Sequence, residues 1–126
     1  MTDRRAQRGP VAAPGNYVYA CLLLLLAEAP NYGYGLAARL GDLGLANVDS
    51  GTVYRALRKL NDEGLVESWW EPGAGPARRR YAVTPAGAAY LEECTPTVAA
   101  SSRSLGSFLA RQRRLAGRSA PVAAHG

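Results

Sequence analysis

Three basic side chains recur at the spacing that brings residues onto one side of an α-helix: Arg55, Arg58 and Lys59. No acidic residue stands four positions before any of them, and Asp62 is the only acid expected near that face. Guanidinium and ammonium groups bind nucleic-acid phosphates and the acceptor atoms on guanine. The spacing therefore predicts a surface that binds a polyanion, and a solvated helix face is the alternative.

A helix that carries these cations also needs an apolar face for packing. At about 100° per residue, four apolar side chains fall within roughly 50° of one direction, opposite the cations: Val53, Ala56, Leu57 and Leu60. Thr52 and Tyr54 flank the basic face near the first turns, which a recognition helix presents to base edges. Asp49 or Ser50 can cap the start of the helix, and Gly64 stands where it should end.

A second basic cluster, Arg78, Arg79 and Arg80, follows a Pro- and Gly-rich segment at 71–77. Aromatic and β-branched residues on both sides of that segment predict two strands joined by a hairpin. Such a hairpin after a recognition helix is a wing, whose arginines can meet phosphates or a minor groove; a solvated basic loop is the alternative. Strand alternation puts Arg79 on the face of Tyr81, so we expect Arg78 and Arg80 to point outward more than Arg79.

In this order of elements the chain resembles the PadR family of winged-helix transcriptional regulators. The resemblance covers about residues 17 to 94, and four motifs carry it: LLAEAPNYGYGL at 25–36, GTVYRALRKL at 51–60, EGLV at 63–66 and RRYAVTPAG at 79–87. Gly35 departs from the family, which has a charged or polar helix former there. Together with Gly41 it should make the first helix of the expected helix-turn-helix, which precedes the helix at 51–60, less rigid.

The resemblance implies the fold and the function. The fold class is mainly α with a small β-hairpin wing, a winged helix-turn-helix followed by a C-terminal dimerisation helix. The implied function is a homodimer that binds a palindromic operator in double-stranded DNA, usually as a repressor, with release by a small-molecule effector in many members. An alternative of another class is a winged-helix protein-interaction module without DNA binding, which uses the same faces on a protein.

The composition agrees with a polyanionic partner. The chain has 126 residues, enough for one domain, and its 15 Lys and Arg against 10 Asp and Glu give a net charge of +5. Charge alone would also fit an anionic membrane surface. The basic excess lies in the recognition helix, the wing and both ends of the chain.

The N-terminal third raises the question of secretion. Arg4, Arg5 and Arg8 precede an apolar run at 17–27, as in a signal peptide. Cleavage there would remove the first helix of the fold, and the eleven apolar residues fall far short of the roughly 20 that span a bilayer. We expect a helix over 16–29, buried nearly all round, that contacts its own domain and a second subunit. The expected location is the cytoplasm, with no membrane partner.

The last third predicts a dimerisation helix. Thr84 can cap this helix and Pro85 can begin it. Pro96 should kink or restart it near Thr95, because proline removes a helical hydrogen bond. The predicted dimer contacts follow the heptad spacing or lie beside it: Leu91, Cys94, Val98, Leu105, Phe108 and Leu109. A surface helix packed on its own domain is the alternative.

These elements divide the chain into four predicted parts. They are a disordered basic arm at 1–15, a winged helix-turn-helix domain at 16–86, a dimerisation helix at 87–115 and a disordered tail at 116–126.

No residue pattern predicts catalysis. The single histidine, His125, lies in the tail, so neither a catalytic triad nor a His-based metal site is expected, and no cofactor is predicted. Cys21 and Cys94 are predicted to be buried thiols, with a redox switch as the alternative. Trp69 and Trp70 must face opposite ways on a strand. One is expected in the core, and a ligand role for either stays open.

Overall fold

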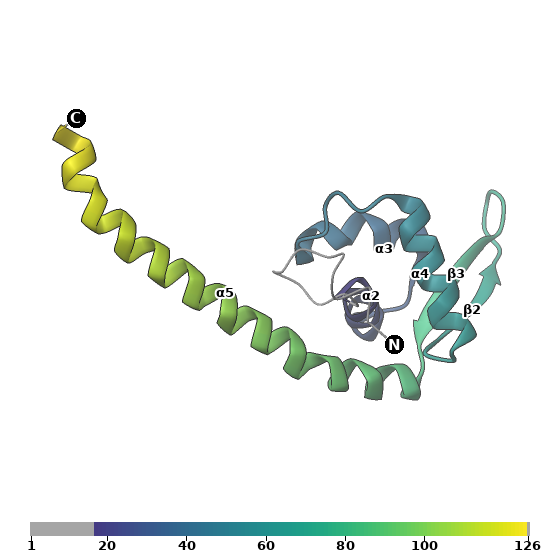
Figure 1. The fold of residues 1–126 in the computed structure, drawn as a ribbon. Coiled ribbons are helices and arrows are strands. Elements are labelled where there is room, and N and C mark those ends of the chain that lie inside the picture. The colour runs from purple at the N-terminus through teal and green to yellow at the C-terminus, as the bar shows by residue number, and fades with distance from the viewer. Residues whose placement is uncertain (1–16, 126) are drawn as a thin grey trace.

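The computed structural model describes the backbone of residues 17–125 and the side chains of residues 17–118 (Figure 1). The predicted basic arm at 1–15 lies outside the described residues. In chain order the elements are α2 (Tyr17–Glu28), β1 (Asn31–Tyr32), α3 (Gly33–Arg39), the 3-10 helix η1 (Leu40–Leu43), α4 (Ser50–Asp62), β2 (Val66–Glu71), β3 (Arg78–Val83) and α5 (Pro85–His125).

The apolar helix α2 forms the centre of the core. Six of its twelve residues are buried, among them Leu22 and Leu23, which are fully enclosed. Helices α3, α4 and α5 and strand β3 all contact it, as Figure 1 shows. The helix predicted at 16–29 is therefore present and buried on most sides, although Leu24 is left exposed.

Helix α4 begins and ends where local signals place it. The Asp49 carboxylate accepts a hydrogen bond from the Thr52 backbone N–H at 2.7 Å, so Asp49 is the cap and Ser50 is the first helical residue. Gly64 adopts a left-handed φ of 76°, and the N–H of Leu65 then reaches the carbonyl of Leu60. The helix therefore spans Ser50–Asp62 and packs its apolar side on the core.

The sheet has three strands in the order β1-β3-β2, all antiparallel. The sequence predicted only the two-stranded hairpin of β2 and β3. The third strand is the two-residue β1, in which Asn31 pairs with Tyr81 and Tyr32 with Arg80. Two residues are too few for alternation to reveal a strand, so this pairing depends on the folded domain. It ties the wing to the start of α3.

Gly35 in α3 lies too close to a neighbouring side chain to carry a Cβ. A Cβ on Gly35 would collide with the Asn31 side chain, whose Oδ1 accepts a hydrogen bond from the Tyr32 N–H. Glycine at position 35 thus permits close packing of β1 on α3. Its predicted effect on helix rigidity stays a prediction.

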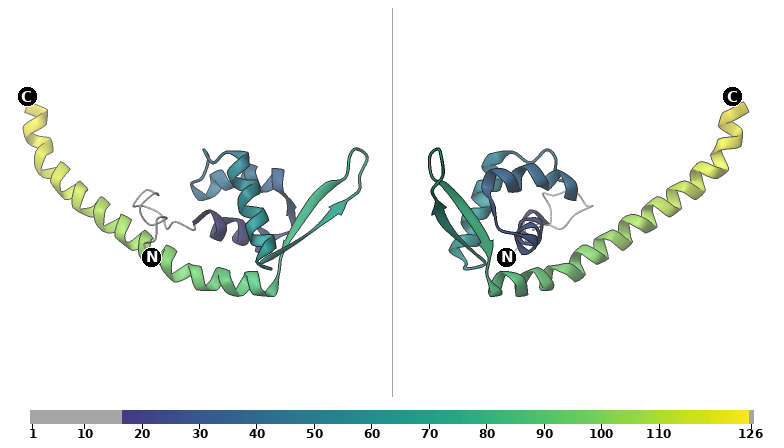
Figure 2. Two further views of the ribbon diagram at one scale, coloured as in Figure 1. Left: turned by 45° about the vertical axis from the view of Figure 1, so that its right-hand side comes forward. Right: turned by 180° about the vertical axis from the view of Figure 1, so that it is seen from behind.

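Helix α5 is longer than the sequence indicated. Thr84 caps it as predicted, because its hydroxyl accepts from the Gly87 N–H at 3.1 Å and donates to the Gly64 carbonyl at 2.7 Å. The helix then runs unbroken from Pro85 to His125 and leaves the domain (Figures 1 and 2). The start at Pro85 is as predicted, and the helix does not restart near Thr95. The division of the chain at residue 87 and the disordered tail at 116–126 stay predictions.

Helix α5 can continue through Pro96 because it bends there. Proline costs one hydrogen bond and distorts the preceding turn, which a packed helix tolerates by bending. The Thr95 hydroxyl donates to the Leu91 carbonyl at 3.0 Å, a bond that also favours bending. Figure 2 shows α5 curved along its length. Extending an existing helix is far cheaper than nucleating one, so α5 continues past this point.

The predicted dimer contacts on α5 fall into two groups. Leu91 and Cys94 pack against the domain of their own chain, and Val98 is half-buried. Leu105, Phe108 and Leu109 lie farther along and are exposed, Phe108 by 67%. The first group thus behaves as the alternative predicted, a helix packed on its own domain. The second group, with Leu115, forms an uncovered apolar stripe that we call the distal stripe.

Both cysteines are buried thiols outside any disulfide, and their burial is as predicted. Burial is the main cause that raises the pKa of Cys21 and of Cys94. Raised pKa values keep thiols protonated and poorly nucleophilic, which agrees with a packing role.

Candidate nucleic-acid interface

The outer face of α4 presents the residues that the sequence singled out. Tyr54, Arg55, Arg58 and Lys59 are exposed, while Thr52 is half-buried at the capped end of the helix. The Arg55 guanidinium donates to the Thr52 hydroxyl at 3.2 Å. Hydrogen bonds from the backbone and side chain of Thr52 lower the pKa of Asp49, and the charge of Arg55 adds to this effect. Thr52 therefore links the capping residue Asp49 to Arg55 and orients the Arg55 side chain.

The cations of α4 differ in their surroundings. Lys59 forms an ion pair with Glu63 at 3.1 Å, four residues later in the chain. The expectation that Asp62 is the only acid near this face was therefore wrong, because it considered acids before each cation and Glu63 follows. Among the described residues, Arg58 takes part in none of the ion pairs. Its charge is available to an external anion.

Arg80 is held within the protein. It donates to Glu71 at 3.1 Å and to the hydroxyl of Tyr32 at 3.3 Å, and the Tyr32 hydroxyl itself donates to Glu71. These two donors are the main causes that lower the pKa of Glu71. We call Tyr32, Glu71 and Arg80 the wing latch, because they join β1 to both strands of the wing.

The wing latch corrects the prediction that Arg78 and Arg80 point outward more than Arg79. Arg80 is only half-exposed, since β1 lies beside β3 and supplies Tyr32. The Arg78 guanidinium stacks over the same Tyr32 ring at 4.0 Å but stays exposed. Arg79 does share a face with Tyr81, as alternation predicts, yet it is exposed as well.

Arg79 is oriented by its neighbours on β2. Its Nε donates to the Ser68 hydroxyl at 3.0 Å, and its guanidinium lies 5.4 Å from the centre of the Trp70 ring. Trp69 and Trp70 are 39% and 61% exposed, so the expectation that one of them is in the core was wrong. Both lie toward the wing tip, beyond the part of the sheet that α4 and the core cover.

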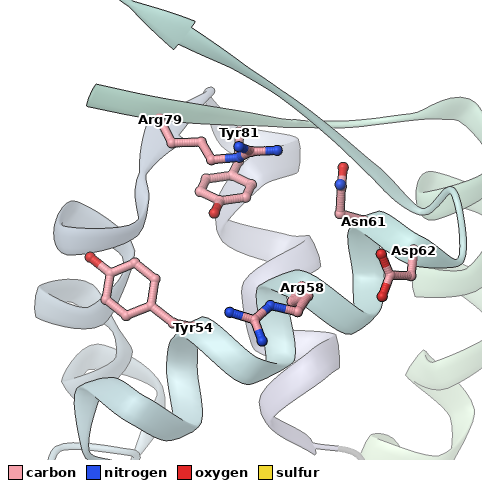
Figure 3. A pocket seen from close by; sticks show the side chains of 6 residues that line it. All are labelled: Tyr54, Arg58, Asn61, Asp62, Arg79 and Tyr81. Carbon is pink, nitrogen blue, oxygen red and sulfur yellow. The ribbon is translucent and has the colours of Figure 1, made fainter. Parts of the chain in front are cut away.

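A cleft separates α4 from the wing and brings together residues that are distant in sequence. It has a volume of about 300 Å³ and is lined by Tyr54, Arg58, Asn61, Asp62, Arg79 and Tyr81 (Figure 3). Figure 3 shows Arg79 alongside the Tyr81 ring and Arg58 on the opposite wall. Burial is the main cause that raises the pKa of Tyr81, and the positive charge of Arg79 opposes it.

Sequence reasoning identified half of this cleft. It selected Tyr54, Arg58 and Arg79 singly, but it did not pair the two arginines or include Tyr81. The sequence placed Asp62 near the basic face without assigning it to a site, and it did not select Asn61, although both stand three and four residues after Arg58 and share its side of the helix. Tyr32 carried no such signal, since its role depends on strand pairing.

Among the side chains described, those of residues 17–118, no group of His, Cys, Asp and Glu could hold a metal ion. None of the helices in this part of the chain is both long enough and apolar enough to cross a membrane.

Comparison with known proteins assigns the family. The model of the transcriptional regulator PadR-like family matches residues 22–93, from α2 into the first turns of α5. The matched segment includes α4, the wing and the whole cleft between them. A search of curated proteins gave no match.

Solved structures agree with this match. A conserved protein of unknown function, described as a potential transcriptional factor, is 32% identical with a TM-score of 0.67, over 86% of this chain and 95% of that chain. A PadR family transcriptional regulator from Eggerthella lenta DSM 2243 is 30% identical with a TM-score of 0.59, over 75% and 82%. A PadR-like transcriptional regulator from Bacillus cereus strain ATCC 14579 is 27% identical with a TM-score of 0.65, over 75% and 92%.

The family is one of transcriptional regulators and not of enzymes. Because its model spans more than half of the sequence and the fold matches solved members, this chain belongs to the PadR-like family of transcriptional regulators.

Proposed function

We propose that the protein is a homodimeric transcriptional repressor that binds a palindromic operator through α4 and the wing. The observation that carries the proposal is the cleft, where cations from α4 and β3 face each other across a gap that opens to solvent. A helix-turn-helix places its second helix in the major groove, and a basic wing reaches the adjacent backbone or minor groove. The family membership supports DNA as the partner.

The side chains divide into two roles in this proposal. Thr52, Tyr54 and Arg55 stand in the first turns of α4 and are proposed to meet base edges. The other predicted contacts are proposed to bind phosphates, namely Arg58, Lys59, Arg78 and Arg79. Arg80, which the sequence placed with them, positions the wing through Glu71 and Tyr32.

Dimerisation is proposed from the distal stripe on α5. Leu105, Phe108 and Leu109 lie on the part of α5 that has left its own domain, and they are exposed among the residues that the structure describes. A second copy would bury this apolar surface, and two-fold symmetry would place two α4 helices on the two halves of a palindrome. Release by a small-molecule effector is proposed from the family alone.

The test begins with selection of duplexes from a random library by the purified protein. We expect an inverted repeat whose half-sites are about one helical turn apart, or a multiple of it. The affinity for the selected duplex should fall linearly with salt on logarithmic axes. Arg58→Ala should weaken binding and flatten this slope. Arg114→Ala, an exposed arginine on α5 away from α4, is the control with the same change of charge.

Repression is tested separately. The selected duplex, placed over the core of a reporter promoter, should lower expression when the protein is present. Recovery of no preferred duplex, together with weak binding that does not respond to salt, would favour a winged-helix module that binds protein and not DNA.

A further inference from the structure

The cleft between α4 and the wing coincides with the path that one DNA strand must take. If α4 occupies a major groove and the wing meets the neighbouring minor groove, the sugar-phosphate strand that divides the two grooves passes between them. The cleft of about 300 Å³ lies between α4 and the wing. The strand should therefore cross over it.

We propose that the cleft holds one DNA phosphodiester group between Arg58 of α4 and Arg79 of β3. The proposal rests on the proposed operator binding and deepens it, because it names the chemical group and the two residues that clamp it. Two guanidinium groups that approach from opposite walls match an anion with several acceptor oxygens.

Arg79 is prepared for this role before DNA arrives. Its Nε donates to the Ser68 hydroxyl at 3.0 Å, and that hydroxyl lies 3.5 Å from Asn61 Oδ1 on α4. The guanidinium also lies over the ring of Trp70 in a cation–π contact. One of the five guanidinium N–H donors is thus used for positioning, and the terminal nitrogens remain for a ligand. A side chain that is already ordered loses less freedom on binding.

Arg58 supplies the opposing charge. It has no ion pair among the residues with described side chains, and the exposed Tyr54 ring stands beside it at the mouth of the cleft. Tyr81, only 7% exposed, walls the cleft with an aromatic ring. Such a wall excludes water and strengthens the attraction between guanidinium and phosphate.

The neighbouring arginines do not fit the same role. Arg80 is held by Glu71 and the Tyr32 hydroxyl, and Arg78 stacks on the Tyr32 ring. Neither of them lines the cleft. Asp62 does line it, and its carboxylate should weaken the binding of any anion there. Asp62→Asn should therefore tighten operator binding.

The experiment combines protein variants with DNA in which single phosphates are neutral. A duplex selected by the parent protein is made with one methylphosphonate at each position of a half-site in turn. For the parent we expect one position where the neutral group lowers affinity roughly tenfold. For R58A and R79A the same position should have a smaller effect, because one of the two partners of that phosphate is gone. R78A, an exposed arginine of the same strand, is the control and should stay sensitive.

Thermal melting of each variant shows that it is folded. R79K keeps the charge but loses the Ser68 bond and the forked geometry, so it should keep the salt slope and lose affinity. Identical methylphosphonate profiles for parent, R58A and R79A, or no gain for D62N, would overturn the phosphate clamp while leaving DNA binding intact. Failure of the parent to select any duplex would instead contradict the proposed function.

Discussion

Arg78, Arg79 and Arg80 are consecutive in the sequence, yet the structure gives each a separate environment. Arg78 stacks on Tyr32, Arg79 is oriented by Ser68, and Arg80 is tied to Glu71. Alternation along β3 explains why Arg79 faces away from the other two. It does not explain why Arg80 is held more firmly than Arg78, which depends on the pairing of Tyr32 with Arg80.

Arg55 and Lys59 should differ in what they contribute to DNA binding. Arg55→Ala should weaken operator binding by about 1 to 3 kcal/mol and relax the preference at one base pair, since Arg55 lies near the first turns of α4. Lys59→Ala should act evenly on all sequences, because Lys59 is proposed to meet a phosphate and not a base edge. Gel-shift titration on selected and random duplexes measures both effects.

Both residues are exposed, so thermal melting should change little in either variant. Unchanged affinity for the selected duplex in both variants would remove α4 as the reading helix.

Glu71→Gln should reveal the wing latch through its pH dependence. The folded-state pKa of Glu71 is lowered below its ordinary value of 4.5, first by the Tyr32 hydroxyl and then by Arg80. The carboxylate therefore contributes stability above pH 4.5, and this contribution disappears as the pH falls through the lower folded value. Glu71→Gln should melt below the parent at pH 7, and the difference should shrink in acid.

Glu67→Gln is the matched control, since Glu67 is an exposed glutamate on the same strand and forms no ion pair within the described chain. A gap between parent and Glu71→Gln that stays constant from pH 7 to pH 3 would show that the latch charge does not stabilise the fold.

The junction between α4, β2 and α5 makes the winged-helix domain continuous with the long helix. The Thr84 hydroxyl accepts a hydrogen bond from the Gly87 N–H and donates one to the Gly64 carbonyl. One side chain thus binds both the start of α5 and the residue that ends α4. The Thr84 N–H also donates to the Leu65 carbonyl at 3.1 Å. The direction in which α5 leaves the domain is therefore set at this junction.

Gly87→Ala should destabilise the fold by about 1 to 3 kcal/mol, the usual cost of overpacking. A Cβ there would collide with the Leu65 carbonyl oxygen, which is backbone and cannot move aside. Gly106→Ala on the same helix is the control. No atom lies near its added Cβ, and alanine should stabilise the helix by about 0.5 to 1 kcal/mol. Urea unfolding of both variants should give changes of opposite sign.

The long α5 extends far beyond the domain that holds its first turns, as Figures 1 and 2 show. Its distal half carries the distal stripe with Arg103 and Arg114 on the opposite side and Arg111 beside Phe108 and Leu115, and no acidic residue follows Glu93. Association through the distal stripe would leave Arg103 and Arg114 in solvent, where they do not repel across the contact. We therefore expect dimerisation, and not the domain core, to depend on this half of the helix.

Leu105→Asp with Phe108→Asp should dissociate the dimer while the domain stays folded. Burying two unpaired carboxylates in an apolar contact is strongly unfavourable, whereas both positions are exposed in the single chain. Sedimentation should show monomer, and operator affinity should fall toward the non-specific level because each half-site is then bound alone.

Ala100→Asp with Ser107→Asp adds the same charge to the arginine-bearing side of α5 and should leave the dimer intact. A Leu105 and Phe108 double variant that remains a dimer with full operator binding would exclude the distal stripe. The half-exposed and exposed residues of α2 would then be the next surface to test.

Several features of this protein follow from the sequence because they depend on neighbours within one or two turns. The 3.6-residue period separates the buried Leu57 from the exposed Arg58, and Asp49, Gly64 and Thr84 bound their helices through short-range hydrogen bonds. The hairpin of the wing is equally local. Those signals sufficed for the winged-helix fold and for most of its basic surface.

Only the tertiary structure decided how distant segments meet. Strand β1 has too few residues to be predicted from the sequence, yet its Tyr32 accepts a hydrogen bond from Arg80, 48 positions later in the chain. Arg58 and Arg79 face each other because α4 and β3 are packed on one core, and no periodicity links them. The heptad spacing of α5 continues smoothly from Leu91 to Phe108, but the first residue packs on the domain core and the second faces solvent. Periodicity fixes which side of a helix is apolar, whereas the position of the rest of the chain determines what covers it.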